Sequence, residues 1–221
     1  MLKNTLKEVI VFYTFVDKLT LGDISAFIDD LSVTEREKIW LLKREKDKIE
    51  SLVGRILLRH MMVTVGIHQI IDTSKISISK TGRPFFKGID YDFNISHSNG
   101  AVACGLFKGG KIGVDIEAVQ HINVEDYRLV LTNEEYFYLQ QQSSMEFIKL
   151  WVTKESVLKA DGRGFLADPQ TLSIRDNYSI INNKKWFNHL LKIKQKYYLA
   201  IALSDKVLPT IKEICISNLI K

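Results

Sequence analysis

Residues 113–117 have the sequence Gly-Val-Asp-Ile-Glu, and residues 151–159 have the sequence Trp-Val-Thr-Lys-Glu-Ser-Val-Leu-Lys. In the first stretch apolar and acidic residues alternate, which predicts a strand with Asp115 and Glu117 on one face and apolar side chains in the core on the other. The second stretch is typical of a helix that carries Glu155. If this helix packs across the strand, a third carboxylate joins the first two.

Three carboxylates with no His or Cys cluster beside them favour a hard cation. Mg²⁺ in proteins is usually held by a few carboxylates together with phosphates of the substrate, so this pattern predicts a substrate that carries phosphate. Lys159 lies four residues after Glu155 and shares its helix face. The alternative is that the acids are the solvent face of an amphipathic strand and that Glu155 and Lys159 form a weak surface ion pair.

A third stretch, Phe93-Asn94-Ile95-Ser96-His97-Ser98, precedes a strand-like segment at 101–107. Its two hydroxyls and imidazole are able to hydrogen-bond phosphate oxygens. A serine hydrolase is not indicated, because the nucleophile motif G-x-S-x-G is absent. A turn histidine without a ligand is the alternative for His97. Upstream, Lys80-Thr81-Gly82-Arg83-Pro84-Phe85 predicts a turn whose arginine would meet a phosphate or stack on a base.

The order of these motifs resembles that of the 4′-phosphopantetheinyl transferases, specifically the surfactin type. The resemblance runs from about Leu31 to about Gly164 and includes Gly162-Arg163-Gly164 after the catalytic helix. It implies an α+β fold, a pseudo-twofold pair of similar α+β halves with the active site in the cleft between them. We place the boundary near Gly109-Gly110. Residues 1–110 then form the half on the adenine and 3′-phosphate side of coenzyme A, and residues 111–221 the half with the metal and the catalytic helix.

The resemblance also implies the reaction. The 4′-phosphopantetheine arm of coenzyme A would pass to a serine of an acyl or peptidyl carrier protein, with Mg²⁺ (or Mn²⁺) as cofactor and 3′,5′-ADP as product, in polyketide or nonribosomal peptide biosynthesis. The implied metal ligands are Asp115, Glu117 and Glu155. Glu155 would also be the general base, while Lys159 would neutralise the phosphates and return a proton to the leaving group.

The implied contacts to coenzyme A include His97 and Ser96 at the phosphates and Lys38 at the 3′-phosphate. The full set of coenzyme A-binding residues is Lys38, Thr81, Gly82, Arg83, Pro84, Ser96, His97 and Lys159, and the catalytic set is Glu155, Lys159 and His97. An acid, Glu50, stands near the position where several bacterial relatives carry Arg.

Composition agrees with a folded enzyme that meets an acidic partner. The 221 residues are 46% hydrophobic and 26% charged, with a net charge of +5, which suits the acidic helix surface expected of a carrier protein. Nucleic acid is not expected, because the densest basic stretch, residues 43–48, is mixed in sign and lacks interleaved aromatics. Neither is a membrane, since the apolar run 9–16 is too short to span one. Cys104 and Cys215 are expected to be buried thiols of a cytoplasmic monomer.

Two alternative functions make different predictions from the sequence. A metal-dependent nuclease with a Glu-x-Lys motif fails, because Val157 stands two residues after Glu155. A non-catalytic scaffold that binds carrier proteins is the second, and it predicts that Glu155 and Lys159 are dispensable. For a protein that modifies or binds a carrier protein, residues 120–143 are the predicted carrier-facing stretch.

Helical periodicity is clearest from Ser32 to Val65. A second helix is predicted to begin after Thr132, with acids in its first turn, and a third to run from near Ser144 to Asp161, ending at Gly162. The predicted strands are Glu8–Phe15, Lys75–Ser79, Ala101–Phe107, Lys111–Glu117, Leu172–Arg175, Leu190–Lys194, Tyr197–Leu203 and Glu213–Ser217.

Overall fold

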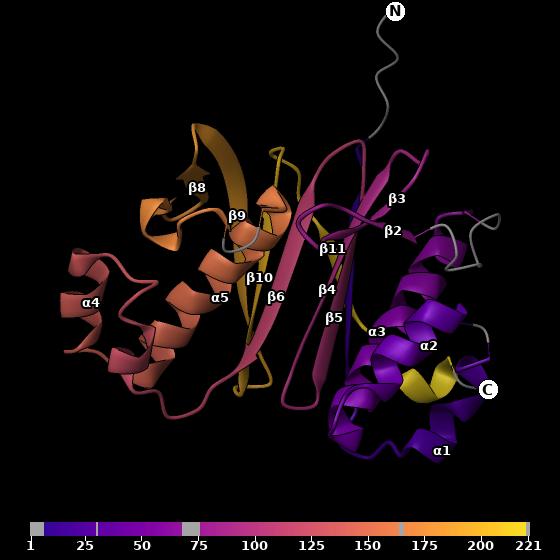
Figure 1. Ribbon diagram of the computed structural model, residues 1–221. Coiled ribbons are helices and arrows are strands. Elements are labelled where there is room, and N and C mark those ends of the chain that lie inside the picture. Colours follow the sequence, from indigo (N-terminus) through magenta and orange to yellow (C-terminus); the bar gives the residue numbers. More distant parts are fainter. Residues whose placement is uncertain (1–6, 30, 68–75, 164–165, 220–221) are drawn as a thin grey trace, which may run out of the picture.

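Two sheets lie face to face between two long helices in the computed structural model, which describes residues 7–29, 31–67, 76–163 and 166–219 (Figure 1). The first sheet has the strand order β11-β1-β5-β4 and the second β6-β10-β9-β8-β7. In the described chain the strands are β1 (Val9–Phe15), β2 (Ile76–Ile78), β3 (Pro84–Phe86), β4 (Tyr91–Ser98), β5 (Ala101–Lys108), β6 (Ile112–Ala118), β7 (Ser173–Ile174), β8 (Tyr178–Ile181), β9 (Lys184–Ile193), β10 (Tyr197–Leu203) and β11 (Thr210–Glu213).

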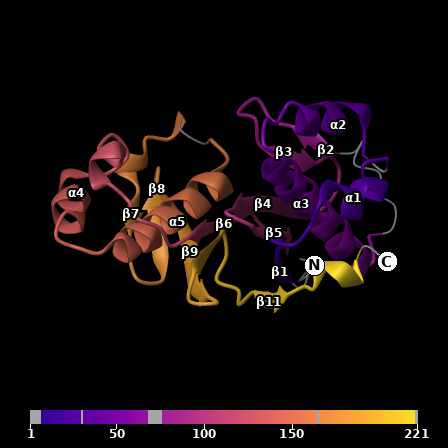
Figure 2. The same ribbon diagram turned by 90° about the horizontal axis from the view of Figure 1, so that it is seen from below.

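Each sheet is covered on its outer face by one long helix. The helix α3 (Glu45–Thr64) packs on β4 and β5 of the first sheet, and α5 (Ser144–Asp161) packs on β6 and β10 of the second. The shorter helices α1 (Leu21–Ile24) and α2 (Val33–Trp40) lie beside α3, while α4 (Asn133–Leu139) lies at the far end of the molecule, beyond α5 (Figures 1 and 2).

The inner faces of the two sheets form a shared core. Strand alternation sends Val9 and Val11 of β1 inward, where they pack with Leu199 and Ile201 of β10. Ile10 and Phe12 of the same β1 strand point outward and pack with α3 instead. Because residues of both sheets bury one another at this interface, the two halves are joined by apolar contact as well as by the chain.

The edges of the two sheets meet along a seam between β4 and β6, and this seam is polar. Three alternate side chains of β4 accept hydrogen bonds from the backbone of β6. The bonds run from Ile112 N to Asp92 Oδ2 (2.9 Å), from Val114 N to Asn94 Oδ1 (2.9 Å) and from Ile116 N to Ser96 Oγ (3.3 Å). Side chains thus take the part that backbone carbonyls play within a sheet and satisfy the buried N–H groups of β6.

Glycine allows α5 to lie directly on β6. A Cβ atom built on Gly113 would lie 1.9 Å from the backbone oxygen of Ser156 and 2.5 Å from the backbone nitrogen of Ala160. No side chain fits there, so the helix backbone approaches the strand backbone. This contact brings two acids together. Asp115 lies two residues after Gly113 on β6, and Glu155 lies one residue before Ser156 on α5.

The buried Lys154 fixes α5 from its other side. Its ammonium is fully buried, pairs with Glu135 of α4 at 2.7 Å and donates to the carbonyl oxygens of Val130 (3.2 Å) and Pro169 (2.9 Å). A buried charge is tolerated only with such partners. The lysine that precedes Glu155 therefore ties α5 to two neighbouring segments.

The α+β class and the two halves predicted from the sequence are confirmed, as are the three main helical regions. Several details differ. The stretch Ser32–Val65 is two helices, α2 and α3, because Arg44 is extended and its guanidinium bonds Asp47 in the first turn of α3 (both bonds 2.9 Å). The β3 and β8 strands, most of β4 and residues 184–189 of β9 were not predicted. Lys75 and Gly164 lie outside the described residues.

The predicted strand Glu213–Ser217 is wrong. The strand is Thr210–Glu213, which pairs in parallel with β1 and ends where Tyr13 pairs with Glu213. Ile214 and Ile216 then turn into the core under α3, with a 3₁₀ turn at Ile216–Asn218. Cys215 is consequently exposed, not buried as predicted, whereas Cys104 is a buried free thiol. The β11 strand lies in the first sheet (Figure 2); the predicted division at residue 110 stays a prediction.

No helix among the described residues has the length and apolar character needed to cross a membrane.

Candidate active site

The β4 strand serves two different groups of residues through its two faces. Phe93, Ile95 and His97 line a cavity beneath α2 and α3. Ser96 and Ser98, which alternate with them, point to β6 and contact its acids. Period-2 alternation is the reason why neighbouring residues of one motif belong to two parts of the site.

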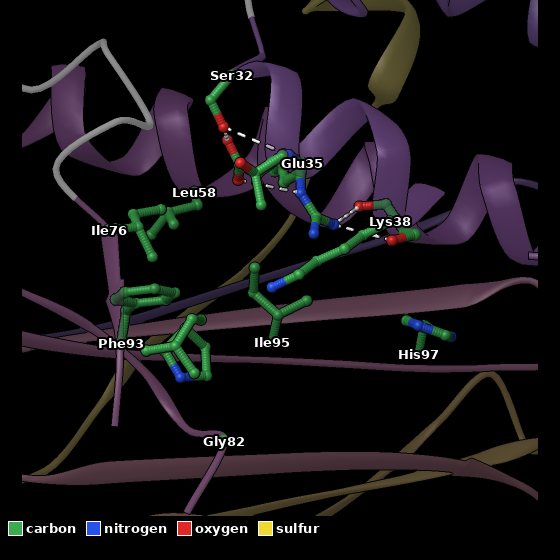
Figure 3. Close-up of a pocket in the computed structure, with 14 residues that line it drawn as sticks. Ser32, Glu35, Lys38, Leu58, Ile76, Gly82, Phe93, Ile95 and His97 are labelled. Carbon is green, nitrogen blue, oxygen red and sulfur yellow. Dashed lines mark hydrogen bonds and ion pairs between the residues drawn. The ribbon is translucent and has the colours of Figure 1, made fainter. Parts of the chain in front are cut away.

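The cavity measures about 580 Å³ and has an apolar floor and a basic rim (Figure 3). Phe93 and Ile95 from β4 form part of the floor, and Lys38 extends into the space from α2. The full lining comprises Ser32, Thr34, Glu35, Lys38, Ser51, Arg55, Leu58, Ile76, Ile78, Gly82, Pro84, Phe93, Ile95 and His97. Flat apolar walls with a few cations suit a nucleotide, whose base is apolar on its faces and whose phosphates are anionic.

Four of the residues predicted to bind coenzyme A line this cavity: Lys38, Gly82, Pro84 and His97. Arg55, which was not among the predicted site residues, also lines the cavity, and its guanidinium donates to Glu35 at 3.3 Å and to the hydroxyl of Ser51 at 2.8 Å. The sequence signal for Arg55 is that it shares a helix face with predicted core positions, and that signal does not separate a cavity wall from a packed core.

Thr81 and Arg83 contact the end of α5 and are not among the cavity residues. Thr81 Oγ1 donates to the carbonyl oxygen of Gly162 at 2.5 Å, and Arg83 Nε donates to that of Lys159 at 2.9 Å. The Arg83 guanidinium also forms a two-pronged ion pair with the buried Asp92, both bonds at 2.7 Å. The arginine therefore joins the turn before β3 to β4, β6 and α5.

The carboxylate group, defined as Asp115, Glu117 and Glu155, lies on the other side of β4. Asp115 is 2% exposed and its Oδ1 accepts from Lys159 Nζ at 2.6 Å and from Ser96 Oγ at 2.7 Å. Glu117 Oε2 accepts from Ser98 Oγ at 2.6 Å. The predicted convergence of a strand and a helix face is thus present, and the Ser-His-Ser motif supplies two of the hydroxyls.

Burial and crowding of negative charge raise the pKa of two of these acids. Burial, and then the charge of Asp115, raises the pKa of Glu117 to about 7, and the same two causes raise the pKa of Glu155. Lys159 opposes the shift in both cases. Carboxylates held close together in a partly dry site favour a bound cation or a bound proton.

Two carboxylate oxygens of this group have no hydrogen-bond partner among the described residues and are therefore free to bind a divalent cation. Asp115 Oδ2 and Glu155 Oε1 are buried and have no hydrogen-bond partner in the part of the chain that the structure describes. Buried carboxylate oxygens without a donor are costly unless an ion or water meets them. Within the same residues, no group of three or more His, Cys, Asp or Glu side chains is arranged to hold a metal ion, so a cation at Asp115 and Glu155 would have to take its other ligands from substrate and water.

Comparison with known proteins assigns both halves to one superfamily. A model described as "4′-phosphopantetheinyl transferase superfamily" matches residues 111–206, and one described as "4′-phosphopantetheinyl transferase, N-terminal" matches residues 20–105.

Individual relatives agree with these models. The chain is 34% identical to 4′-phosphopantetheinyl transferase gsp of Aneurinibacillus migulanus over 127 residues, 54% of this chain and 51% of that protein. It is 29% identical to 4′-phosphopantetheinyl transferase Sfp of Bacillus subtilis (strain 168) over 173 residues, 75% of each chain. Thus the match spans about half the length of gsp and three quarters of Sfp. Since family models of one kind cover both halves and relatives of the Sfp type align across them, the chain belongs to the 4′-phosphopantetheinyl transferase superfamily.

Proposed function

We propose that this protein transfers the 4′-phosphopantetheine arm of coenzyme A to a serine of an acyl or peptidyl carrier protein. The superfamily acts on carrier proteins with coenzyme A. The observation that carries the proposal is that the two faces of β4 point to two different sites. His97 lines a nucleotide-sized cavity on one side, and Ser96 contacts the carboxylate group on the other. Coenzyme A has a nucleotide at one end and a pyrophosphate in the middle, so one ligand would engage both.

In the reaction the serine oxygen bonds to the phosphorus that bears the pantetheine. The bond from that phosphorus to the bridging oxygen of the pyrophosphate breaks, and 3′,5′-ADP leaves with the electron pair. Glu155 takes the serine proton. Its raised pKa, caused by burial and by Asp115, brings the carboxyl closer to the range in which a general base works at neutral pH.

Asp115 and Glu155 would hold the cation through Oδ2 and Oε1, and Glu117 is the third proposed ligand, which would have to move to reach the ion. Mg²⁺ is the proposed ion and Mn²⁺ the alternative. Such an ion offsets the charge that the pyrophosphate develops. Lys159, whose side chain is 29% exposed, neutralises Asp115 and faces the same space, where it would protonate the departing phosphate. On the cavity side, Lys38 would bind the 3′-phosphate of coenzyme A, and His97 would contact its phosphates.

The carrier protein would approach the segment 120–143, which includes α4. Exposed apolar side chains gather there at Leu129, Phe137 and Tyr138. We also propose that the enzyme is a cytoplasmic monomer, and its free thiols Cys104 and Cys215 suit a reducing compartment.

Intact-protein mass spectrometry of an apo carrier protein, incubated with the enzyme, coenzyme A and Mg²⁺, tests the proposal. We expect a mass gain of one phosphopantetheine arm. Glu155→Gln should slow it by roughly 10²–10⁴-fold, the usual share of a general base. Glu146→Gln is the matched control, because Glu146 lies on the same helix in a partly exposed pair with Lys149 and should leave the rate unchanged.

Carrier proteins from several pathways should be offered in parallel. Binding of a carrier without any mass gain would favour the non-catalytic scaffold, and equal rates for Glu155→Gln and wild type would remove Glu155 from the mechanism.

A further inference from the structure

Glu50 is a buried acid on the apolar face of α3. It is 3% exposed, and Val53, Gly54 and Leu57, which lie three, four and seven residues later and so share its helix face, are buried too. A carboxylate in such a place costs free energy unless donors meet both of its oxygens. The hydrogen-bond partners of these two oxygens therefore indicate the role of Glu50.

Both oxygens of Glu50 are occupied by the end of β4 and the turn that follows. Glu50 Oε2 lies 3.0 Å from His97 Nδ1, and Glu50 Oε1 accepts from the backbone nitrogen of Gly100 at 2.6 Å. The bond to Gly100 fixes the carboxylate, and the fixed carboxylate then fixes the ring.

This arrangement determines how His97 meets the cavity. Its side chain is 39% exposed and lines the cavity, whereas the Glu50 side chain behind it is 4% exposed. When Nδ1 donates to Glu50, Nε2 is the ring nitrogen left to face a ligand. A buried carboxylate behind a histidine is the usual device for orienting the ring.

We propose that Glu50 is a positioning residue: it holds His97 with Nε2 toward the cavity, so that the ring donates a charge-assisted hydrogen bond to a phosphate oxygen of coenzyme A. This inference rests on the proposed function, because it needs coenzyme A in the cavity. It assigns to Glu50 an effect on coenzyme A binding although the residue itself touches no ligand.

The test compares Glu50→Gln with Glu45→Gln, an exposed acid of the same helix. Calorimetry gives the Kd for coenzyme A, and carrier modification gives kcat and KM. In Glu50→Gln, the amide oxygen still accepts from Gly100, but the amide nitrogen is a donor and faces Nδ1, so the acceptor that holds the ring is lost. We expect Kd and KM for coenzyme A to rise roughly tenfold, as for loss of one charge-assisted bond, with kcat within about twofold. Glu45→Gln should match wild type.

The decisive measurement repeats the substitution in His97→Ala. If Glu50 acts through the ring, Glu50→Gln no longer raises Kd in that background. An equal rise in both backgrounds, or an unchanged Kd beside a lowered Tm, would show that Glu50 only stabilises the fold and would overturn the proposal. Glu50→Asp, which keeps the charge but is shorter, should lie between wild type and Glu50→Gln, and supplies the comparison if the glutamine variant unfolds.

The two proposals fail differently. Transfer by wild type with no change of Kd in Glu50→Gln overturns only the role of Glu50. Absence of transfer overturns the proposed function, while the calorimetric comparison still decides whether Glu50 acts through His97.

Discussion

At the scale of single residues, the site is built from acids that water does not fully reach. Lys159 and Ser96 stabilise the ionised Asp115. Among the described residues, Glu117 has only the hydroxyl of Ser98 as a hydrogen-bond partner, which does not offset the effect of burial and of the neighbouring Asp115 charge on its pKa. Spacing in the sequence predicted that these acids would converge, because the periods of a strand and a helix are local. Glu50 also carried a signal, an acid on an otherwise apolar helix face, but its partner was unpredictable since His97 is 47 residues away.

The pH dependence of stability should reveal Glu117. Its pKa is raised from 4.5 to about 7, so between these values the folded protein binds more protons than the unfolded chain. The stabilisation is then complete below about pH 4.5 and is lost as pH rises through 7. The Glu117→Gln variant lacks this carboxyl, so it does not lose this stabilisation as pH rises. In EDTA, its free energy of unfolding relative to wild type should be higher at pH 8 than at pH 5, by about 2 kcal/mol after allowing for partial exposure.

Urea unfolding at the two pH values measures this difference. A relative stability that does not change with pH, or that changes in the opposite sense, would mean that Glu117 ionises normally in the folded protein.

At the scale of elements, the position of α5 decides the geometry of the site. Its end was predictable, because Gly162 adopts the left-handed conformation (φ 81°) of a helix C-terminus. The capping box of α4, Thr132 with Glu135, was predictable as well. The break between α2 and α3 was not, since residues 41–44 contain neither glycine nor proline. The face that α5 turns to β6 depends on Gly113, whose role is visible only with both elements in place.

Gly113→Ala should therefore damage both fold and activity. The new methyl group would meet helix backbone, which cannot move aside as a side chain does. We expect a loss of about 1–3 kcal/mol of stability and a fall of at least about tenfold in kcat, because Glu155 moves relative to Asp115. Thermal unfolding and carrier modification measure the two effects.

Gly22→Ala is the control. A Cβ there would lie 3.6 Å from its nearest neighbour, Thr20 Oγ1, an ordinary contact, so it should leave activity unchanged. If Gly113→Ala behaved in the same way, the close approach of α5 to β6 would be refuted.

At the scale of the whole molecule, two sheets share one apolar core and one polar seam. Apolar contact in the core holds the two sheets together but does not fix their alignment. The polar seam sets the register of β4 against β6, and therefore the position of the cavity relative to the carboxylate group. A shift of one residue along the seam would exchange the side chains that face the cavity with those that face the acids.

Asn94→Ala tests the seam at its centre. Removal of the side chain leaves the buried N–H of Val114 without its acceptor. We expect a loss of roughly 1–3 kcal/mol together with faster hydrogen exchange at the Val114 amide. Asn123→Ala removes a similar side-chain bond to the backbone of Glu125, but an exposed one, and should cost less. Unchanged exchange at Val114 would show that the backbone of β6 does not depend on β4.

By itself, the sequence determined which chemical groups the site contains and which local faces they share. Alternation placed Asp115 with Glu117, helical spacing placed Glu155 with Lys159, and the order of motifs indicated the superfamily, because these features depend on residues only a few positions apart. Only the tertiary structure decided that Gly82 and Pro84 face the cavity while Arg83 pairs with Asp92, that Glu50 holds His97, and that β4 hydrogen-bonds β6 through side chains. Those contacts join segments 9 to 47 residues apart, and they form only when burial of the shared core brings the two sheets together.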